Sequence, residues 1–328
     1  MSMSEIRLKT RLSEDRLQAL VGRVLEDDAY DILLTGPARV LKPTGQTLAV
    51  YVPRAIPASL MDASYEVLHE LRKFETDNRG PASGVLKAPR VRQRHGLPGE
   101  EVPEDEPATG RMRARTRPVA SAIIGAIDPA GPKNFCRLTA WTGAEWNKFE
   151  GLFPLFKEIN GQFERHVPER YAVQQEVVAR TKPEWVIRDT VFSTITVNNS
   201  YPTGVHKDAG DLEEGFSNVT ALRRGNFRGG RLVFPEWRVA VDLQHGDTIL
   251  MDAHDWHGNT MLYCQRCGDP MERGWHPDCK DGQGEASERI SVVAYFRTKV
   301  AQCASLDEEH RKGMEFADRG TERGKRLA

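Results

Sequence analysis

The feature that most constrains this chain is a His-x-Asp pair followed, after several short strands, by another histidine. The pair is His206 and Asp208, and the later histidine is His257. Between them lie four apolar, β-branched runs punctuated by Gly and Pro, at 219–222, 231–234, 239–243 and 248–251. Short strands at this spacing are typical of a small antiparallel barrel or jelly roll, which brings distant parts of a chain together.

The three residues make a candidate metal site. Two neutral imidazoles and one carboxylate on one face of a metal leave the opposite positions open, as in non-heme Fe(II) oxygenases. The spacing of His206 and Asp208 suits the end of a strand, where alternate side chains point the same way. His254 competes with His257 for the third position, or could orient a group behind the ligands. We favour His257, because the small Gly258 beside it leaves room at a crowded metal.

A strongly strand-like run at 288–296 carries Arg289 and Ser291 on one face. A guanidinium and a hydroxyl placed together can bind the distal carboxylate of a 2-oxoglutarate held by the metal. Arg297 falls on the same face and is a weaker candidate for this role. The Arg-x-Ser pair is therefore predicted to complete the site.

The five cysteines are too few for a disulfide scaffold, and three of them lie in one short stretch. Cys264-x2-Cys267 followed by His276-x2-Cys279 has the spacing of a structural zinc site, and Gly268 suits the tight turn that such thiolates make. The alternatives are a solvated loop with unligated thiols and, less favoured in a reducing compartment, a reversible Cys264–Cys267 disulfide.

Composition divides the chain into four parts. Residues 1–75 are predicted to contain helices at 13–25 and 57–72, 76–118 to form a charged insertion, 119–300 to form the core with a cysteine-bearing insertion at 260–287, and 301–328 to form a charged, helical tail. Within the core, Thr142 is predicted to open a helix as part of a capping box, and Pro154 to kink or split that helix. A further helix at about 168–180 leads into a strand at 189–198 that delivers the His-x-Asp loop.

Charge is segregated within the insertion at 76–118. Its basic residues are Arg90, Arg92, Arg94, Arg111, Arg113, Arg115 and Arg117, and its acidic residues are Glu100, Glu101, Glu104, Asp105 and Glu106. Arginines at alternate positions of an extended strand could follow a phosphate backbone. Alternatively, the two signs neutralise each other in a solvated loop.

The whole chain has a formal net charge of −1, so its global charge does not indicate a nucleic-acid binder. The first residues lack an apolar targeting segment, and no apolar run approaches membrane-spanning length. A cytoplasmic protein without membrane contact is therefore predicted.

Several motifs together carry a family resemblance. They are Thr194-Ile195-Thr196-Val197-Asn198, His206-Lys207-Asp208, Gly229-Gly230-Arg231-Leu232-Val233-Phe234-Pro235, Gly246-Asp247, His257-Gly258-Asn259 and Arg289-Ile290-Ser291. In this order they resemble the TET/JBP family of Fe(II)- and 2-oxoglutarate-dependent dioxygenases, over about residues 119–296. The cysteine-bearing insertion departs from the family pattern by lengthening the gap between His257 and Arg289.

The resemblance implies an α+β fold with a double-stranded β-helix core, jelly-roll or cupin-like, flanked by N-terminal helices. It implies iron ligands His206, Asp208 and His257, 2-oxoglutarate contacts from Arg289 and Ser291, and O2 as co-substrate. The family oxidises the 5-methyl group of pyrimidines in nucleic acid.

The expected partner is therefore DNA, with the target base flipped out or single-stranded, because a base within a duplex cannot reach a buried metal. The expected reaction converts 5-methylcytosine to 5-hydroxymethylcytosine. Arg223, Arg224, Arg228 and the loop arginines are candidates to hold the nucleotide. Alternatives are thymine hydroxylation within the same family, hydroxylation of a protein or small molecule, and a binding module without turnover.

Overall fold

The computed structural model describes residues 3–76, 79–84, 90–92, 100–102, 112–113, 118–130, 133–271 and 287–327. His276 and Cys279 of the predicted zinc site lie outside these residues, as do Arg94, Arg111, Arg115 and Arg117 of the insertion and its acidic residues Glu104, Asp105 and Glu106. Helices and strands are both well represented, which agrees with the predicted α+β class.

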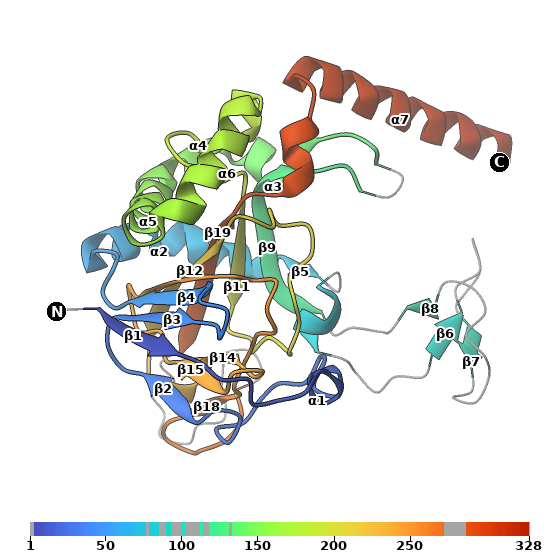
Figure 1. Ribbon diagram of the computed structural model, residues 1–328. Coiled ribbons are helices and arrows are strands. Elements are labelled where there is room, and N and C mark those ends of the chain that lie inside the picture. The colour runs from blue at the N-terminus through green and yellow to red at the C-terminus, as the bar shows by residue number, and fades with distance from the viewer. Residues whose placement is uncertain are drawn as a thin grey trace.

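A large, mainly antiparallel sheet forms the centre of the molecule (Figure 1). Its strands in spatial order are β1 (Ser4–Arg7), β3 (Ala38–Leu41), β4 (Thr47–Val52), β16 (Thr248–Met251), β12 (Ser217–Arg224), β19 (Glu288–Tyr295), β11 (Thr194–Asn199), β9 (Val119–Ile127) and β10 (Arg137–Leu138), with β5 (Glu75–Thr76) also paired to β9. Strands from both ends of the chain therefore meet in one sheet. The central strands β12, β19 and β11 place the segment carrying Arg289 beside the strand that precedes His206.

A smaller sheet packs against the large one to complete the jelly roll. It contains β17 (Gly258–Asn259), β14 (Leu232–Phe234), β15 (Val239–Val241) and β2 (Ile32–Leu34), and β13 (Phe227–Gly229) pairs separately with β18 (Leu262–Cys264). One apolar cluster joins the two sheets, with Val219 and Ala221 from β12 and Val239 and Val241 from β15 among its buried members. Burying both inner faces in this way is what stabilises a β-sandwich.

Helices cover the outer face of the large sheet (Figure 1). They are α2 (Ala58–Glu70), continued by η1 (Leu71–Lys73), α4 (Trp146–Gly151), α5 (Phe153–His166) and α6 (Pro168–Arg180), and α3 (Ala140–Ala144) leads into them. The predicted split at Pro154 is confirmed, because α4 ends at Gly151 and Pro154 lies in the first turn of α5, where a missing N–H costs nothing.

Two helix predictions were wrong in detail. The helix predicted at 13–25 is only α1 (Glu14–Gln18), because Gly22 adopts φ +75° and Val21 and Leu25 form bridges with other parts of the chain. Thr142 does not cap a helix: Thr139 caps α3, and its hydroxyl accepts from the Thr142 N–H at 3.3 Å. Pairing with distant segments shortened the first helix, and the nearby Thr139 took the capping position in the second.

The described part of the insertion forms three short strands, β6 (Arg90–Arg92), β7 (Glu100–Val102) and β8 (Met112–Arg113). In the antiparallel register of β6 and β7, Arg92 is paired with Glu100.

The C-terminal helix α7 (Leu306–Leu327) projects from the body of the molecule (Figure 1). Shortly before it, Cys303 forms a disulfide with Cys136, at a sequence separation of 167 residues. Cysteine spacing did not anticipate this bond.

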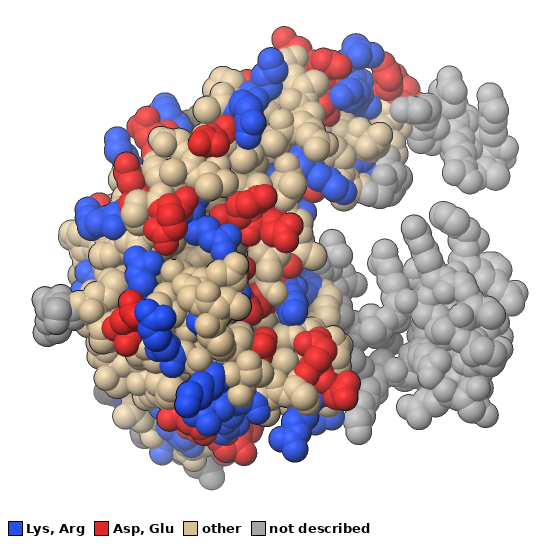
Figure 2. Space-filling view, viewed as in Figure 1, with Lys and Arg blue, Asp and Glu red and all other residues tan. Residues whose placement is uncertain are grey.

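Positive and negative side chains are interspersed over the described residues of the face in Figure 2, in keeping with the near-neutral net charge. Among the described residues, every helix is too short or too polar to span a bilayer.

Candidate active site

The two candidate histidines are neighbours through their backbones. The His206 N–H donates to the His257 carbonyl at 2.9 Å, and the His257 N–H donates back at 3.0 Å. Their rings consequently lie side by side, with centroids 4.3 Å apart. His206 belongs to an isolated bridge beyond the end of β11, so the prediction that the pair sits at a strand end was wrong.

The imidazole orientations suit metal binding. The Nδ1 atom of His206 lies 2.8 Å from the Gly204 carbonyl, and that of His257 lies 2.9 Å from the Asp255 carbonyl. A backbone carbonyl can only accept, so each neutral ring carries its proton on Nδ1 and presents the Nε2 lone pair to the centre of the site.

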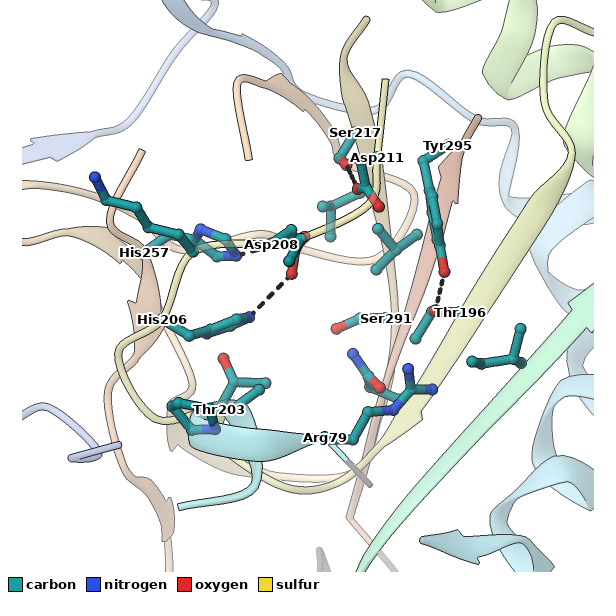
Figure 3. Close-up of a pocket in the computed structure, with 18 of the residues that line it drawn as sticks. Arg79, Thr196, Thr203, His206, Asp208, Asp211, Ser217, His257, Ser291 and Tyr295 are labelled. Atoms are coloured by element: carbon teal, nitrogen blue, oxygen red, sulfur yellow. Dashed lines mark hydrogen bonds and ion pairs between the residues drawn. The ribbon is translucent and has the colours of Figure 1, made fainter. Parts of the chain in front are cut away.

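Asp208 completes the cluster. Its carboxylate lies 3.3 Å from His206 Nε2 and 3.9 Å from His257 Nε2, and the three ligand atoms all fall within 4.8 Å of one another (Figure 3). Burial lowers the pKa of His257 to about 4, which keeps this imidazole neutral. Burial opposes ionisation of Asp208, but its contact with the His206 imidazole lowers the pKa of the carboxyl overall. A neutral donor and a carboxylate are the forms that a metal requires.

Gly258 was predicted to leave room at the metal, but the atoms that limit the space beside it belong to the backbone of Val205. A Cβ placed there would lie 3.1 Å from both N and Cα of Val205. We expect Gly258→Ala to lower the free energy of unfolding by about 1–3 kcal/mol and to weaken iron binding, because the His206–His257 pair must separate to make room. Gly161→Ala is the control: nothing lies within 4 Å of that position in α5, so the same change should stabilise by about 0.5–1 kcal/mol. Denaturant unfolding measures the stability of each variant, and iron titration measures its iron affinity. Equal changes in both variants would contradict the role assigned to Gly258.

His254 is not part of the cluster. Its Nδ1 lies 3.2 Å from an Asp252 carboxylate oxygen, and that aspartate also pairs with Lys42 at 3.2 Å. Among the described residues, the potential metal ligands that come together are His206, Asp208 and His257.

The triad opens into a cavity of about 520 Å³ between the two sheets. One face of β19 and of its continuation lines this cavity, through Arg289, Ser291, Val293, Tyr295 and Arg297. The alternation predicted for Arg289 and Ser291 thus extends further along the strand. Thr196 and Asn198, on the neighbouring strand β11, line the same cavity, and the Thr196 and Tyr295 hydroxyls are 3.1 Å apart (Figure 3).

Arg289 is a buried cation with no carboxylate partner among the described residues. Its side chain donates to the Ser291 hydroxyl at 2.6 Å, and its stem passes Gly230, where an added Cβ would lie 3.1 Å from the Arg289 Cδ. Burial, followed by the charge of Arg223, lowers the pKa of Arg289 to about 10, so it stays protonated at neutral pH. A buried charge without a partner is costly unless a ligand supplies the counter-charge. The pair therefore fits the carboxylate of a bound co-substrate.

Arg297, the weaker candidate, is already neutralised. Its Nε lies 2.5 Å from a carboxylate oxygen of Asp128, which is almost fully buried. Asp211 faces the same region and accepts from the Ser217 hydroxyl at 3.1 Å (Figure 3). Burial, followed by the charge of Asp208, raises the pKa of Asp211 to about 7.

Arg79 is a further cation at the cavity, which sequence reasoning missed (Figure 3). Its Nε donates to the Ser121 hydroxyl at 2.8 Å, while Nη2 is buried and has no hydrogen-bond partner among the described residues. It precedes the short helix η2 (Gly80–Ser83), which forms one wall of the cavity. The only available signal was a Gly-Pro turn inside a segment interpreted as a loop.

The arginines proposed to surround the cavity mouth lie elsewhere. Arg223 pairs with Asp242 at 2.6 Å, Arg224 stacks on the ring of Tyr65, and Arg228 stacks on that of Tyr263. None of the three lines the cavity.

The described half of the predicted zinc site forms a tight turn. Cys264 is buried at the end of β18, Cys267 is exposed, and the Gly268 N–H donates to the Cys264 carbonyl at 3.0 Å. Gly268 adopts φ +79°, a conformation that favours glycine, as expected from its position.

Comparison with known proteins gives one family match, to the Tet_JBP oxygenase domain of the 2OGFeDO superfamily, over residues 129–298. The bifunctional helicase and thymine dioxygenase JBP2 of Trypanosoma brucei brucei is 32% identical over 166 residues, which are 50% of this chain and 13% of that protein. Thymine dioxygenase JBP1 of Crithidia fasciculata is 30% identical over 236 residues, 70% of this chain and 24% of that protein. The chain therefore spans less than a quarter of these relatives' length.

Among solved structures, NgTET1 in complex with 5mC DNA matches with a TM-score of 0.51 and 11% identity, covering 93% of this chain and 100% of that one. This similarity shows the fold, the double-stranded β-helix of 2-oxoglutarate oxygenases.

Proposed function

This chain belongs to the TET/JBP family of Fe(II)- and 2-oxoglutarate-dependent oxygenases, and from that premise we propose that it hydroxylates the 5-methyl group of a pyrimidine in DNA. The observation that carries the proposal is one cavity that contains a His-Asp-His cluster, an unpartnered buried guanidinium and apolar and aromatic walls.

His206, Asp208 and His257 would hold Fe(II), and Arg289 with Ser291 would bind the distal carboxylate of 2-oxoglutarate. With O2, these cofactors supply an oxidant that replaces a methyl hydrogen by hydroxyl while 2-oxoglutarate becomes succinate and CO2. The protein contributes by fixing the positions of the metal ligands and of the co-substrate. Carbonyl-anchored Nδ1 atoms fix the imidazoles, and burial strengthens the Arg289 interaction because little water competes for it.

The remaining cavity would receive the base. Val293 and Tyr295 follow Ser291 on the same face of β19, so an apolar group and a ring adjoin the co-substrate position. Such a cavity inside a barrel admits a single nucleotide, not a paired base, so we propose that the target is flipped out of the duplex or presented as a single strand.

Two pyrimidines remain as substrates. The relatives identified by sequence are named as thymine dioxygenases, whereas the solved structure with the similar fold contains 5mC DNA. 5-Methylcytosine is our first proposal and thymine the alternative. The two bases differ at one exocyclic group, which is the N4 amino donor in cytosine and the O4 acceptor in thymine. Asp211 is a carboxylate at the cavity that could read this difference.

Incubation with Fe(II), 2-oxoglutarate and oligonucleotides that contain 5-methylcytosine, followed by mass spectrometry of nucleosides, tests the proposal. 5-Hydroxymethylcytosine supports the first substrate and 5-hydroxymethyluracil the second. Formation of neither, in protein that still consumes 2-oxoglutarate, would overturn the assignment.

Asp211→Asn should reduce discrimination between the two bases. A carboxylate only accepts when ionised, whereas an amide both donates and accepts, so the ratio of kcat/KM for the two substrates should fall by about tenfold. Consumption of 2-oxoglutarate without DNA is the control and should change by less than about twofold. An unchanged ratio would show that Asp211 does not read the base.

We also propose that Cys264 and Cys267 hold structural zinc together with His276 and Cys279. The support is that Cys264 and Cys267, two residues apart, both lie in the tight turn that the Gly268 N–H closes. In metal-stripped, iron-reconstituted protein, we expect stoichiometric zinc that is lost in Cys267→Ser, because removing one of four ligands opens a closed site. Metal analysis measures this, with Cys136→Ser as the control that should keep its zinc. The assignment would be wrong if the Cys267→Ser variant kept its zinc or if the parent protein contained none.

A further inference from the structure

The Cys136–Cys303 disulfide joins two segments that each contribute residues to the lining of the catalytic cavity. Both cysteines are buried, at 3% and 6% exposure, and their Cα atoms are 5.9 Å apart. Neither belongs to the metal cluster or the cysteine-bearing insertion. The bond joins two segments that are distant in sequence, so its loss would allow these two segments to move relative to each other.

Each joined segment supplies part of the cavity lining. The first runs on from β9 through Asp128 and Ala130 to Arg137, which follows Cys136 directly, and all three of these residues line the cavity. The second runs from Arg297 through η4 (Thr298–Gln302) to Cys303. The disulfide therefore connects the two parts of the wall that meet in the Asp128–Arg297 ion pair.

A buried carboxylate reinforces the same junction without a covalent bond. Glu309, in the first turns of α7, accepts from the Cys136 N–H at 2.6 Å and from the Ala304 N–H at 3.1 Å, and it is 3% exposed. With the Asp128–Arg297 pair, this contact can keep the two segments adjacent if the disulfide opens. Reduction should therefore loosen the wall and leave the protein folded.

The two segments differ in their other attachments. Backbone hydrogen bonds of 2.8 Å and 3.0 Å tie Phe296 and Thr298 to the loop that follows Asp208. The described part of the first segment, between Asp128 and Cys136, has a local backbone pair between Ala130 and Lys133, and it contacts α7 through side chains such as Phe135 against Phe316. The β9–β10 connection should therefore move more when the covalent link is lost.

We propose that this disulfide is a redox-controlled clamp on the substrate-facing wall of the cavity. The closed form holds Asp128 and the β9–β10 connection in place, and the dithiol form lets that connection move, which weakens binding of the nucleotide. The substrate part of this inference rests on the proposed function. The metal cluster and Arg289 are held by separate strand pairing and should be unaffected.

The chemistry is thiol–disulfide exchange. A reducing dithiol attacks one sulfur and forms a mixed disulfide, and its second thiol resolves that bond. Two electrons pass from the dithiol to the Cys136–Cys303 pair, each cysteine gains one proton, and the dithiol becomes a disulfide. Oxidised dithiol drives the reverse reaction. Because both sulfurs are buried, exchange requires transient opening at the start of α7.

The test compares wild-type protein after oxidation by oxidised dithiothreitol and after reduction by dithiothreitol, with thiol titration to define each state. Hydrogen exchange on metal-free protein should show faster exchange at 128–136 in the reduced form. In the loaded enzyme, the KM for methylated DNA should rise by about tenfold on reduction, whereas 2-oxoglutarate affinity should change by less than about twofold.

Cys136→Ser/Cys303→Ser is the matched control. It retains Cys264 and Cys267, so it should behave like the reduced protein in both buffers if the clamp is responsible. Glu309→Gln gives an independent check: it should have little effect on the oxidised protein and should increase exchange further in the reduced protein, because the two ties are coupled.

The inference is wrong if peptide mapping of the oxidised protein finds no Cys136–Cys303 bond, if exchange and KM are the same in both states, or if the double variant still responds to redox. Failure to oxidise DNA in either state would overturn the proposed substrate only, since hydrogen exchange still reports on the clamp.

Discussion

His257→Ala should remove iron binding and lower turnover of 2-oxoglutarate by about a thousandfold or more, because a bound metal supplies several kcal/mol of transition-state stabilisation. His257 is buried, its Nε2 faces the Asp208 carboxylate, and its Nδ1 is held by a backbone carbonyl. Loss of this imidazole leaves two ligands, too few for a stable Fe(II) site. Iron titration and succinate formation measure the loss.

His254→Ala is the matched control, a change of the same residue type on the same segment. His254 contacts Asp252, which keeps its pairing with Lys42 when the imidazole is removed. We therefore expect iron affinity and turnover within about threefold of the parent, with at most a small loss of stability. If His254→Ala lost iron as completely as His257→Ala, the assignment of the third ligand would be wrong. Thermal melting of metal-free protein shows whether either variant is folded.

The metal cluster could be predicted because each of its residues carries a strong local signal. His206 and Asp208 are close in sequence, and His257 is followed by a glycine whose missing Cβ accommodates the opposing backbone. The core strands were predictable for a similar reason, since 219–222 is the centre of β12 and 248–251 coincides with β16.

Features that depend on contacts between distant segments were not predictable. The Cys136–Cys303 bond spans 167 residues, and Asp128 is recognisable as part of the cavity only when Arg297 lies beside it. Arg79 was missed because it lies in a Gly- and Pro-rich segment, which the sequence pattern predicts to be a loop. Only the tertiary structure shows that this segment lines the cavity. A sequence pattern reports local preference, whereas these contacts are determined by the tertiary fold.

For Arg223, Arg224 and Arg228, nucleotide contacts stay a prediction. Their positive charge made them candidates for nucleotide contacts, but an acidic or aromatic partner engages each one. Positive charge alone does not identify a binding residue. The useful distinction is whether the folded protein already supplies the partner, and by this criterion Arg289 differs from these three arginines.

Arg289→Met should raise the KM for 2-oxoglutarate by about a hundredfold, since losing one side of a buried charge interaction costs about 2–5 kcal/mol. The same substitution should stabilise the protein in the absence of co-substrate. Burial lowers the pKa of Arg289 from its usual range to about 10. A lowered pKa in a cation means that folding disfavours its charged form, a cost present below pH 10 and relieved as pH rises above it. Replacing the guanidinium by an apolar chain removes this cost at neutral pH, with an expected gain of about 1–2 kcal/mol.

Arg223→Met separates this effect from a general response to losing an arginine. Arg223 is paired with Asp242, so its removal leaves a carboxylate without its partner and should lower stability, by about 1 kcal/mol. Thermal melting with and without 2-oxoglutarate measures both quantities: the parent and Arg223→Met should be stabilised by co-substrate, and Arg289→Met should not. If Arg289→Met instead melted below the parent and kept its response to 2-oxoglutarate, Arg289 would be a structural residue. The opposite signs follow from one difference, because Asp242 neutralises Arg223 within the fold whereas the counter-charge for Arg289 must come from a ligand.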